Sequence, residues 1–117
     1  MFISLVAAML LCAGLNQEPA EPVPELMRVT CYTATGNCMA NGEMPYEGCV
    51  AGKKEDIGKK VKIYDLNMNL IGEYEIKDTG GKLIRTGQRI DVYRDTLSRC
   101  FDWVHEYGDY LYIEIEQ

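Results

Sequence analysis

Apolar and polar residues alternate along much of the chain after residue 26, and a period of two residues is typical of half-buried β-strands. Where alternation is weaker, an enrichment in β-branched and aromatic residues also indicates a β-strand. The pattern predicts strands over 27–35, 48–51, 89–93 and 110–115, and a hairpin over 61–77 that turns at 65–70. In the last strand, Leu111, Ile113 and Ile115 share one face.

Apolar residues change to helical spacing after residue 93. The residues at this spacing are Leu97, Cys100, Phe101 and Val104. A helix is predicted over 96–107, with Asp95 as its N-cap and Gly108 as its stop. The stretches 36–48 and 53–60 lack periodicity and are predicted to be loops.

Six short strands with one helix before the last strand predict a mostly-β fold. Closing such strands into a small barrel removes their exposed edges. We therefore expect a six-stranded barrel that occupies residues 27–117 as one domain.

The first 26 residues have a different character. Residues 1–14 are an apolar run, too short to span a bilayer comfortably, and they resemble the apolar part of a secretory signal. No Lys or Arg precedes Arg28, so an uncleaved anchor, a lipoprotein attached through Cys12, or a truncated start are alternatives. Residues 15–26 are rich in Pro and Glu and are predicted to form an extended stem.

Charge and cysteine content narrow the function classes. The chain of 117 residues has a net charge of −6, which argues against a nucleic-acid partner. Without the leader four cysteines remain, and an even number in a short exported chain suggests two disulfides. The candidates are Cys31, Cys38, Cys49 and Cys100. A zinc site is the weaker alternative because the chain has no Cys-x-x-Cys pair.

Two carboxylates, Asp78 and Asp91, stand at the beginning and end of one glycine-containing loop. Two carboxyl groups brought together by a turn are a common device for acid–base chemistry on sugars. The alternative is structural: Asp78 caps a turn, and Asp91 forms an ion pair with Arg89 or Arg94.

Five short motifs carry a resemblance to a known family. They are Cys-Tyr-Thr-Ala-Thr-Gly at 31–36, Gly-Cys-Val-Ala at 48–51, Ile-Gly-Lys-Lys-Val at 57–61, Lys-Asp-Thr-Gly-Gly at 77–81 and Arg-Ile-Asp-Val-Tyr at 89–93. In this order the chain resembles the 3D-domain proteins, named for three aspartates. It is also similar to the catalytic barrel of membrane-bound lytic transglycosylase A and to the rare lipoprotein A and expansin group.

The resemblance implies a double-psi β-barrel that acts on peptidoglycan by lytic transglycosylase-like cleavage of the bond between MurNAc and GlcNAc, without metal or cofactor. It assigns the acid–base role to Asp91 and places Asp78 beside it. We expect Ile90 and Val92 to desolvate Asp91, and the charge of Asp78 to raise its pKa further. The expected substrate-binding residues are Tyr32, Thr33, Thr79, Gly80, Gly81 and Tyr93.

The chain departs from the family at the third aspartate, which normally follows the Val-Ala step. Here Gly52 follows Val50-Ala51, so the aspartate is missing or is replaced by Asp56. Catalysis is therefore less firmly implied than the fold.

Several other functions fit the same residues. One is a non-catalytic carbohydrate-binding barrel of expansin type. A homodimeric aspartic protease is suggested by Asp78-Thr79-Gly80, but Lys77 stands where an apolar residue is usual. A disulfide-rich structural protein is the third. In the preferred interpretation the protein is secreted or bound to a bacterial or phage cell envelope. Because the domain is small for binding a polymer alone, a homodimer or a separate targeting domain is a candidate partner.

Overall fold

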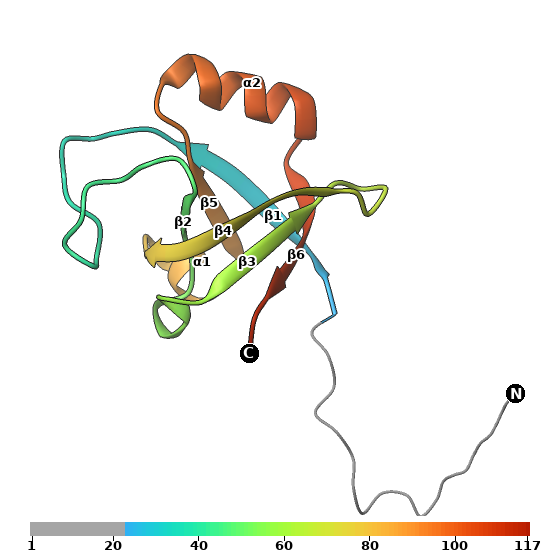
Figure 1. Ribbon diagram of the computed structural model, residues 1–117, viewed down its shortest axis with the longest axis horizontal. Coiled ribbons are helices and arrows are strands. Elements are labelled where there is room, and N and C mark those ends of the chain that lie inside the picture. The colour runs from blue at the N-terminus through green and yellow to red at the C-terminus, as the bar shows by residue number, and fades with distance from the viewer. Residues whose placement is uncertain (1–22) are drawn as a thin grey trace, which may run out of the picture.

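The computed structural model describes residues 23–117, so the apolar leader and most of the stem lie outside the described residues. Six strands form a closed barrel in the order β1-β5-β2-β4-β3-β6, with a helix across one end (Figure 1). The strands are β1 (Glu25–Tyr32), β2 (Cys49–Ala51), β3 (Lys60–Tyr64), β4 (Leu70–Asp78), β5 (Arg89–Tyr93) and β6 (Tyr110–Ile115). The expected mostly-β, six-stranded closed barrel is confirmed.

The barrel interior is filled by the apolar member of each alternating pair. The fully buried aliphatic side chains come from all six strands: Val29, Val50, Val61, Ile63, Ile76, Ile90, Val92 and Leu111. Because successive residues of a strand point to opposite faces, the residues between them lie on the outer wall. Thr30 and Asp91 are two such outward residues.

The order of strands differs from their order along the chain. β1 pairs with β5 in parallel, and β2 pairs with β4 in parallel, while the remaining neighbours are antiparallel. β6 closes the barrel between β1 and β3. This interleaving places β2 between the two strands that carry Asp78 and Asp91.

Two loops contain short helical turns that the sequence pattern did not predict. Residues Lys54–Asp56 form a 3-10 turn (η3), and Lys82–Arg85 form a single α-helical turn (α1). β1 begins at Glu25, so the last two residues of the expected stem belong to the barrel. The stretch 36–48 has no strand or helix, as predicted, but β1 ends at Tyr32, so residues 33–35 belong to this loop and not to the expected first strand.

The long helix α2 (Leu97–Tyr107) has nearly the predicted length but a different cap and a different buried face. Thr96 is the N-cap, and its side chain accepts a hydrogen bond from the backbone N–H of Arg99. Gly108 ends the helix with a φ of 76°, a conformation that glycine adopts without strain. Because α2 turns Cys100 and Trp103 inward, the predicted apolar positions Leu97, Phe101 and Val104 are exposed.

The four cysteines form no disulfide among the described residues, which corrects the expectation of two. The Sγ atoms of Cys31 and Cys100 are 3.0 Å apart, well beyond the disulfide bond length of about 2.0 Å. Cys38 lies on the exposed loop beside Met44. Cys49 is buried in β2 beside Met39, so the strand and the loop hold these last two thiols apart.

Candidate functional site

The backbones of Asp78 and Asp91 are aligned with each other by β2. Ala51 at the end of β2 has Asp78 of β4 as its register partner on one side and Asp91 of β5 on the other. A bulge in the β2–β4 pairing, between Val50 and Ala51, sets this register. Since adjacent strands are about 4.8 Å apart, the two aspartate backbones are separated by roughly 10 Å.

Thr30 extends this row by one strand and is a site residue that sequence reasoning missed. It is the register partner of Asp91 on β1, and its hydroxyl donates a hydrogen bond to the Asp91 carboxylate at 2.7 Å. Thr30, Asp91, Ala51 and Asp78 therefore form a row across β1, β5, β2 and β4. The alternation of β1, with Val29 buried, could have indicated that Thr30 faces outward, but not which strand it meets.

Burial raises the pKa of Asp91 above its usual value, while the Thr30 hydroxyl and the charge of Arg89 act in the opposite direction. A raised pKa of Asp91 was expected from the sequence, and burial is the expected cause. The charge of Asp78 was expected to raise this pKa further, but it is not among the causes. Among residues 23–117 no salt bridge joins Asp91 to Arg89 or Arg94, and Arg94 instead lies 3.6 Å from Glu47.

The Asp78 carboxylate accepts hydrogen bonds from two backbone N–H groups, one in the next residue and one in the 33–48 loop. Its Oδ1 accepts hydrogen bonds from the backbone N–H of Thr79 at 2.8 Å and of Ala40 at 2.9 Å. The first bond is local, since it comes from the residue that directly follows Asp78. The second fastens the 33–48 loop to the end of β4, so Asp78 also positions the loop beside the site.

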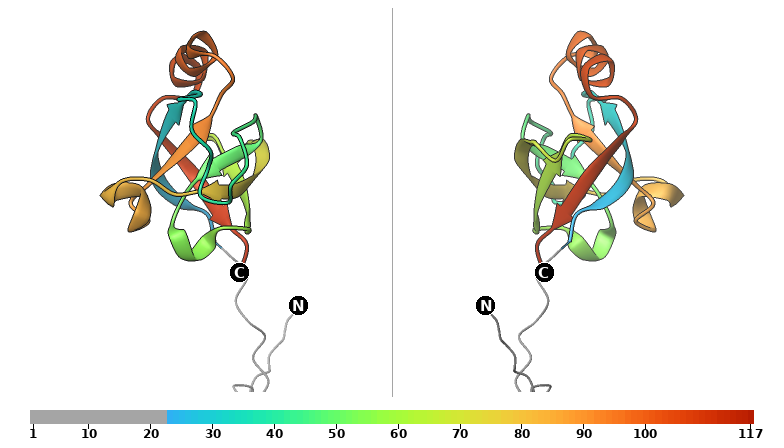
Figure 2. Two further views of the ribbon diagram at one scale, coloured as in Figure 1. Left: turned by 90° about the vertical axis from the view of Figure 1, so that its left-hand side faces the viewer. Right: turned by 90° about the vertical axis from the view of Figure 1, so that its right-hand side faces the viewer.

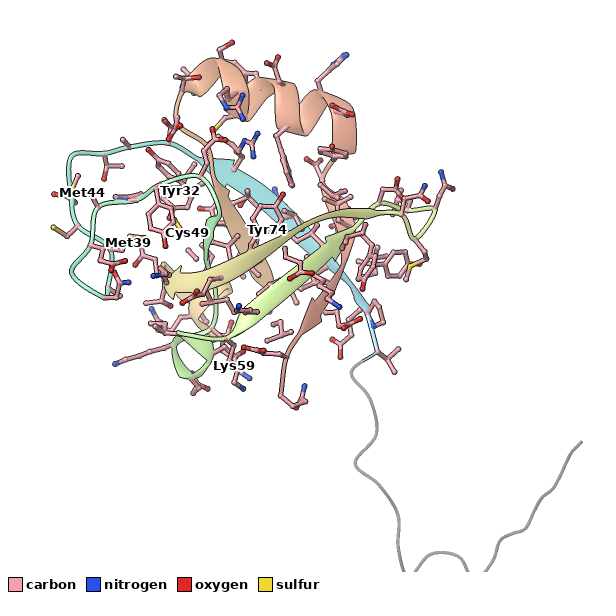
Figure 3. All side chains as sticks on the ribbon, in the orientation of Figure 1. Tyr32, Met39, Met44, Cys49, Lys59 and Tyr74 are labelled. Carbon is pink, nitrogen blue, oxygen red and sulfur yellow. The ribbon has the colours of Figure 1, made fainter. Side chains whose placement is uncertain are left out.

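Two buried hydroxyls near the aspartates have no hydrogen-bond partner among the described residues: Tyr32 OH and Thr79 Oγ1. Burial raises the pKa of Tyr32, and the Cys49 thiol and the charges of Asp78 and Asp91 raise it further. Tyr32 is therefore within electrostatic reach of both carboxylates. Figure 3 shows it beside Cys49 and Met39, under the 33–48 loop.

The other expected binding residues differ in their burial and contacts. Tyr93 is buried, and its ring meets Tyr32 edge-to-face with centroids 5.3 Å apart. Thr33 is half-buried directly after β1, whereas Gly80 and Gly81 are exposed. A Cβ at Gly80 would lie 2.8 Å from the Cδ1 of Ile84, so a larger residue there would force the Ile84 side chain to shift.

Asp56, the suggested substitute for the third family aspartate, lies in η3 and forms a salt bridge with Lys59 at 3.0 Å. At the position where the family has that aspartate, Gly52 donates its backbone N–H to the carbonyl of Asp78. Asp56 therefore forms a surface ion pair. It follows β2 in the chain, whereas the 33–48 loop precedes β2.

No group of three or more His, Cys, Asp or Glu side chains in residues 23–117 is arranged to hold a metal ion. Within the same residues, no helix is long and apolar enough to cross a membrane. In comparisons with known proteins, no family model matches the chain, and no curated protein matches it.

Proposed function

We propose that this protein is a cell-envelope protein that cleaves peptidoglycan glycan strands at the MurNAc–GlcNAc bond, with Asp91 as the acid–base residue. The observation that carries the proposal is a half-buried carboxyl group whose pKa is raised by burial, in register with a second carboxylate. The double-psi topology suggested by the sequence motifs and export from the cell are parts of the same proposal.

The proposed reaction uses one carboxyl group twice. Protonated Asp91 donates its proton to the glycosidic oxygen as the bond to the anomeric carbon breaks. The resulting carboxylate then removes the proton from the C6 hydroxyl of the same MurNAc ring, whose oxygen attacks the anomeric carbon. The product is a 1,6-anhydro sugar, the proton returns to Asp91, and no water is consumed.

The remaining site residues have roles that follow from their surroundings. The Asp78 carboxylate stabilises positive charge that develops at the anomeric carbon. The unpaired hydroxyls of Tyr32 and Thr79 supply hydrogen bonds to the sugar, because a buried hydroxyl without a partner is costly unless a ligand or water satisfies it. Thr30 is a positioning residue that orients the Asp91 carboxylate through its 2.7 Å hydrogen bond.

A non-catalytic glycan-binding barrel is the second candidate. It is favoured by Gly52, which stands where the resembled family has its third aspartate. It is also favoured by the hydrogen bond from Ala40 to Asp78, since this bond holds the loop beside the row and occupies one carboxylate oxygen. Such a protein would bind the glycan with the same residues and release no product.

The test is a digest of purified cell walls, analysed by mass spectrometry for anhydro-muropeptides. We expect the native protein to release them and the Asp91→Asn variant to lose at least 99% of this activity, because one general acid–base group contributes roughly 100-fold or more. Asp109→Asn, at an exposed position after α2, is the matched control and should retain full activity. Equal release by the native protein and Asp91→Asn would remove Asp91 from the mechanism. Sedimentation with walls and no product would favour the binding barrel.

A further inference from the structure

A cavity of about 340 Å³ lies between α2 and the barrel and is separate from the row of aspartates. It is bounded by Tyr74 of β4 and by the side of α2 that carries Trp103 and Tyr107. Neither Asp78 nor Asp91 lines it. Figure 1 shows α2 crossing above the end of the barrel where β1 finishes, and Figure 3 shows Tyr74 on β4, below α2.

Two residues that line this cavity, Trp103 and Arg94, each carry a buried hydrogen-bond donor with no acceptor among the described residues. Trp103 is only 4% exposed, and its indole Nε1 is buried and unpaired. The Nε of Arg94 is also buried and unpaired, although the guanidinium lies 5.3 Å from the centroid of the Trp103 ring. Both groups can only donate, so whatever satisfies them must supply acceptor oxygens. The positive charge of Arg94 favours a carboxylate.

The rim of the cavity carries charges of both signs: Arg99 lines it and is paired with Glu47, and two carboxylates line it as well. Asp102 and Glu106, four residues apart on one face of α2, both line the cavity and are exposed. A ligand that spans the cavity would therefore meet donors in its interior and carboxylates at its edge. The rings of Tyr74, Trp103 and Tyr107 are packed edge-to-face. They supply an apolar wall between the interior donors and the carboxylates at the edge of the cavity.

We propose that this cavity is a binding site for a short peptide that carries a free carboxylate and an ammonium group. The carboxylate accepts from Trp103 and Arg94, and the ammonium lies against Asp102 and Glu106. An aliphatic side chain packs on the aromatic wall. If the proposed function is correct, the ligand is the peptide that branches from the glycan; this identification of the source, though not the site, rests on that function.

The chain provides its own reporter for this site, because Trp103 is its only tryptophan. The test is a titration of intrinsic fluorescence with the tripeptide L-Ala-γ-D-Glu-L-Lys, which has carboxylates and ammonium groups. We expect saturable quenching or a shift of the emission maximum. The same peptide with its carboxyl groups amidated should bind at least ten-fold more weakly, and acetate at equal ionic strength should not compete.

Variants separate this site from the aspartate row. Arg94→Gln should weaken tripeptide binding at least ten-fold, whereas Asp91→Asn should leave it unchanged. Since Arg94 also neighbours Glu47, circular dichroism checks folding, and the amidated peptide tests the native protein without any substitution. No saturable change with the tripeptide, or equal binding of the acidic and amidated forms, would overturn the proposal. Tripeptide binding without glycan cleavage would leave this site standing and refute only the proposed function.

Discussion

Asp91 has a hydrogen-bond partner, Thr30, that the pattern of residues along the chain could not connect to it. Alternation along 89–93 correctly predicted that Ile90 and Val92 share the buried face and that Asp91 points outward. Thr30 was not predicted, because its contact with Asp91 joins residues 61 positions apart through parallel strand pairing. A sequence pattern gives the face of each residue, whereas the order of strands in the sheet decides which residues meet on that face.

The raised pKa of Asp91 has a consequence for stability that does not depend on any enzymatic activity. A carboxyl group whose pKa is higher in the folded state stabilises the fold at low pH, and this contribution is lost as the pH rises through the folded-state pKa. We therefore expect Asp91→Asn to melt at a higher temperature than the native protein near pH 7, because the amide is not ionised. Asn also retains an oxygen that can accept from Thr30.

This advantage should disappear as the pH falls below about 3.8, the ordinary value for Asp. Thermal unfolding followed by circular dichroism between pH 3 and pH 7 measures the difference. Asp109→Asn removes the same charge from an exposed position and serves as the control. A variant less stable than the native protein at pH 7 and equal to it at pH 3 would show that the carboxylate form is the stabilised one.

Helix α2 shows how far the pattern of apolar residues predicts an element. Helical spacing and Gly108 gave its length to within one residue, since both are local properties of the chain. The buried face was wrong in part because Leu97, Phe101 and Val104 are apolar but face solvent. Which side of a helix packs is decided by the barrel end beneath it, and this surface is assembled from distant strands.

The start of α2 is fixed to the 33–48 loop by Glu47. Its carboxylate accepts from the guanidinium of Arg99, from the backbone N–H of Asp95 at 3.0 Å, and lies near Arg94. Hydrogen bonds from Arg99, more than the other contacts, lower the pKa of Glu47 to about 2. One side chain thereby connects the loop, the end of β5 and the first turn of the helix.

We expect Glu47→Gln to destabilise the protein by about 1 kcal/mol near neutral pH, as for a partly exposed ion pair supported by hydrogen bonds. A group with a lowered pKa stabilises the fold above its unfolded-state pKa and loses this effect as the pH falls through its folded-state pKa. The difference between native protein and variant should therefore shrink between pH 4.5 and about pH 2. Urea titrations at several pH values measure it, with Glu55→Gln at an exposed position as control. A pH-independent difference would assign the effect to packing rather than charge.

At the scale of the whole molecule, the number of strands was predictable but their neighbours were not. Most of the strands can be recognised from the local pattern of residues, although the three residues of β2 are all buried and show no alternation. The position of β6, which closes the barrel against β1 and β3 from far along the chain, has no such local signal. The carboxylates at 78 and 91 were expected to meet across their own loop. They are instead aligned through β2, a three-residue strand that precedes both of them.

We expect the closed core to make the barrel unfold as a single cooperative unit. Ile63 is fully buried, and its register partners are Gly72 of β4 and Ile113 of β6. Ile63→Ala should cost about 2–5 kcal/mol, a large share of the roughly 5–15 kcal/mol that stabilises a typical domain. Lys62→Ala, at the exposed neighbouring position, should change stability by less than about 0.5 kcal/mol. Urea unfolding monitored by Trp103 fluorescence and by circular dichroism measures both, and non-coincident transitions would contradict a single unit.

The antiparallel pairing of Glu25 with Ile113 brings the start of β1 and the finish of β6 to the same pole, and α2 occupies the opposite pole (Figure 2). A linker to a bead, a sensor chip or a fused domain can therefore be attached on either side of the barrel sequence without approaching α2. Protein immobilised through one terminus or the other will present the same hemisphere to a soluble peptide. Agreement between the two orientations becomes an internal check on any surface-based measurement.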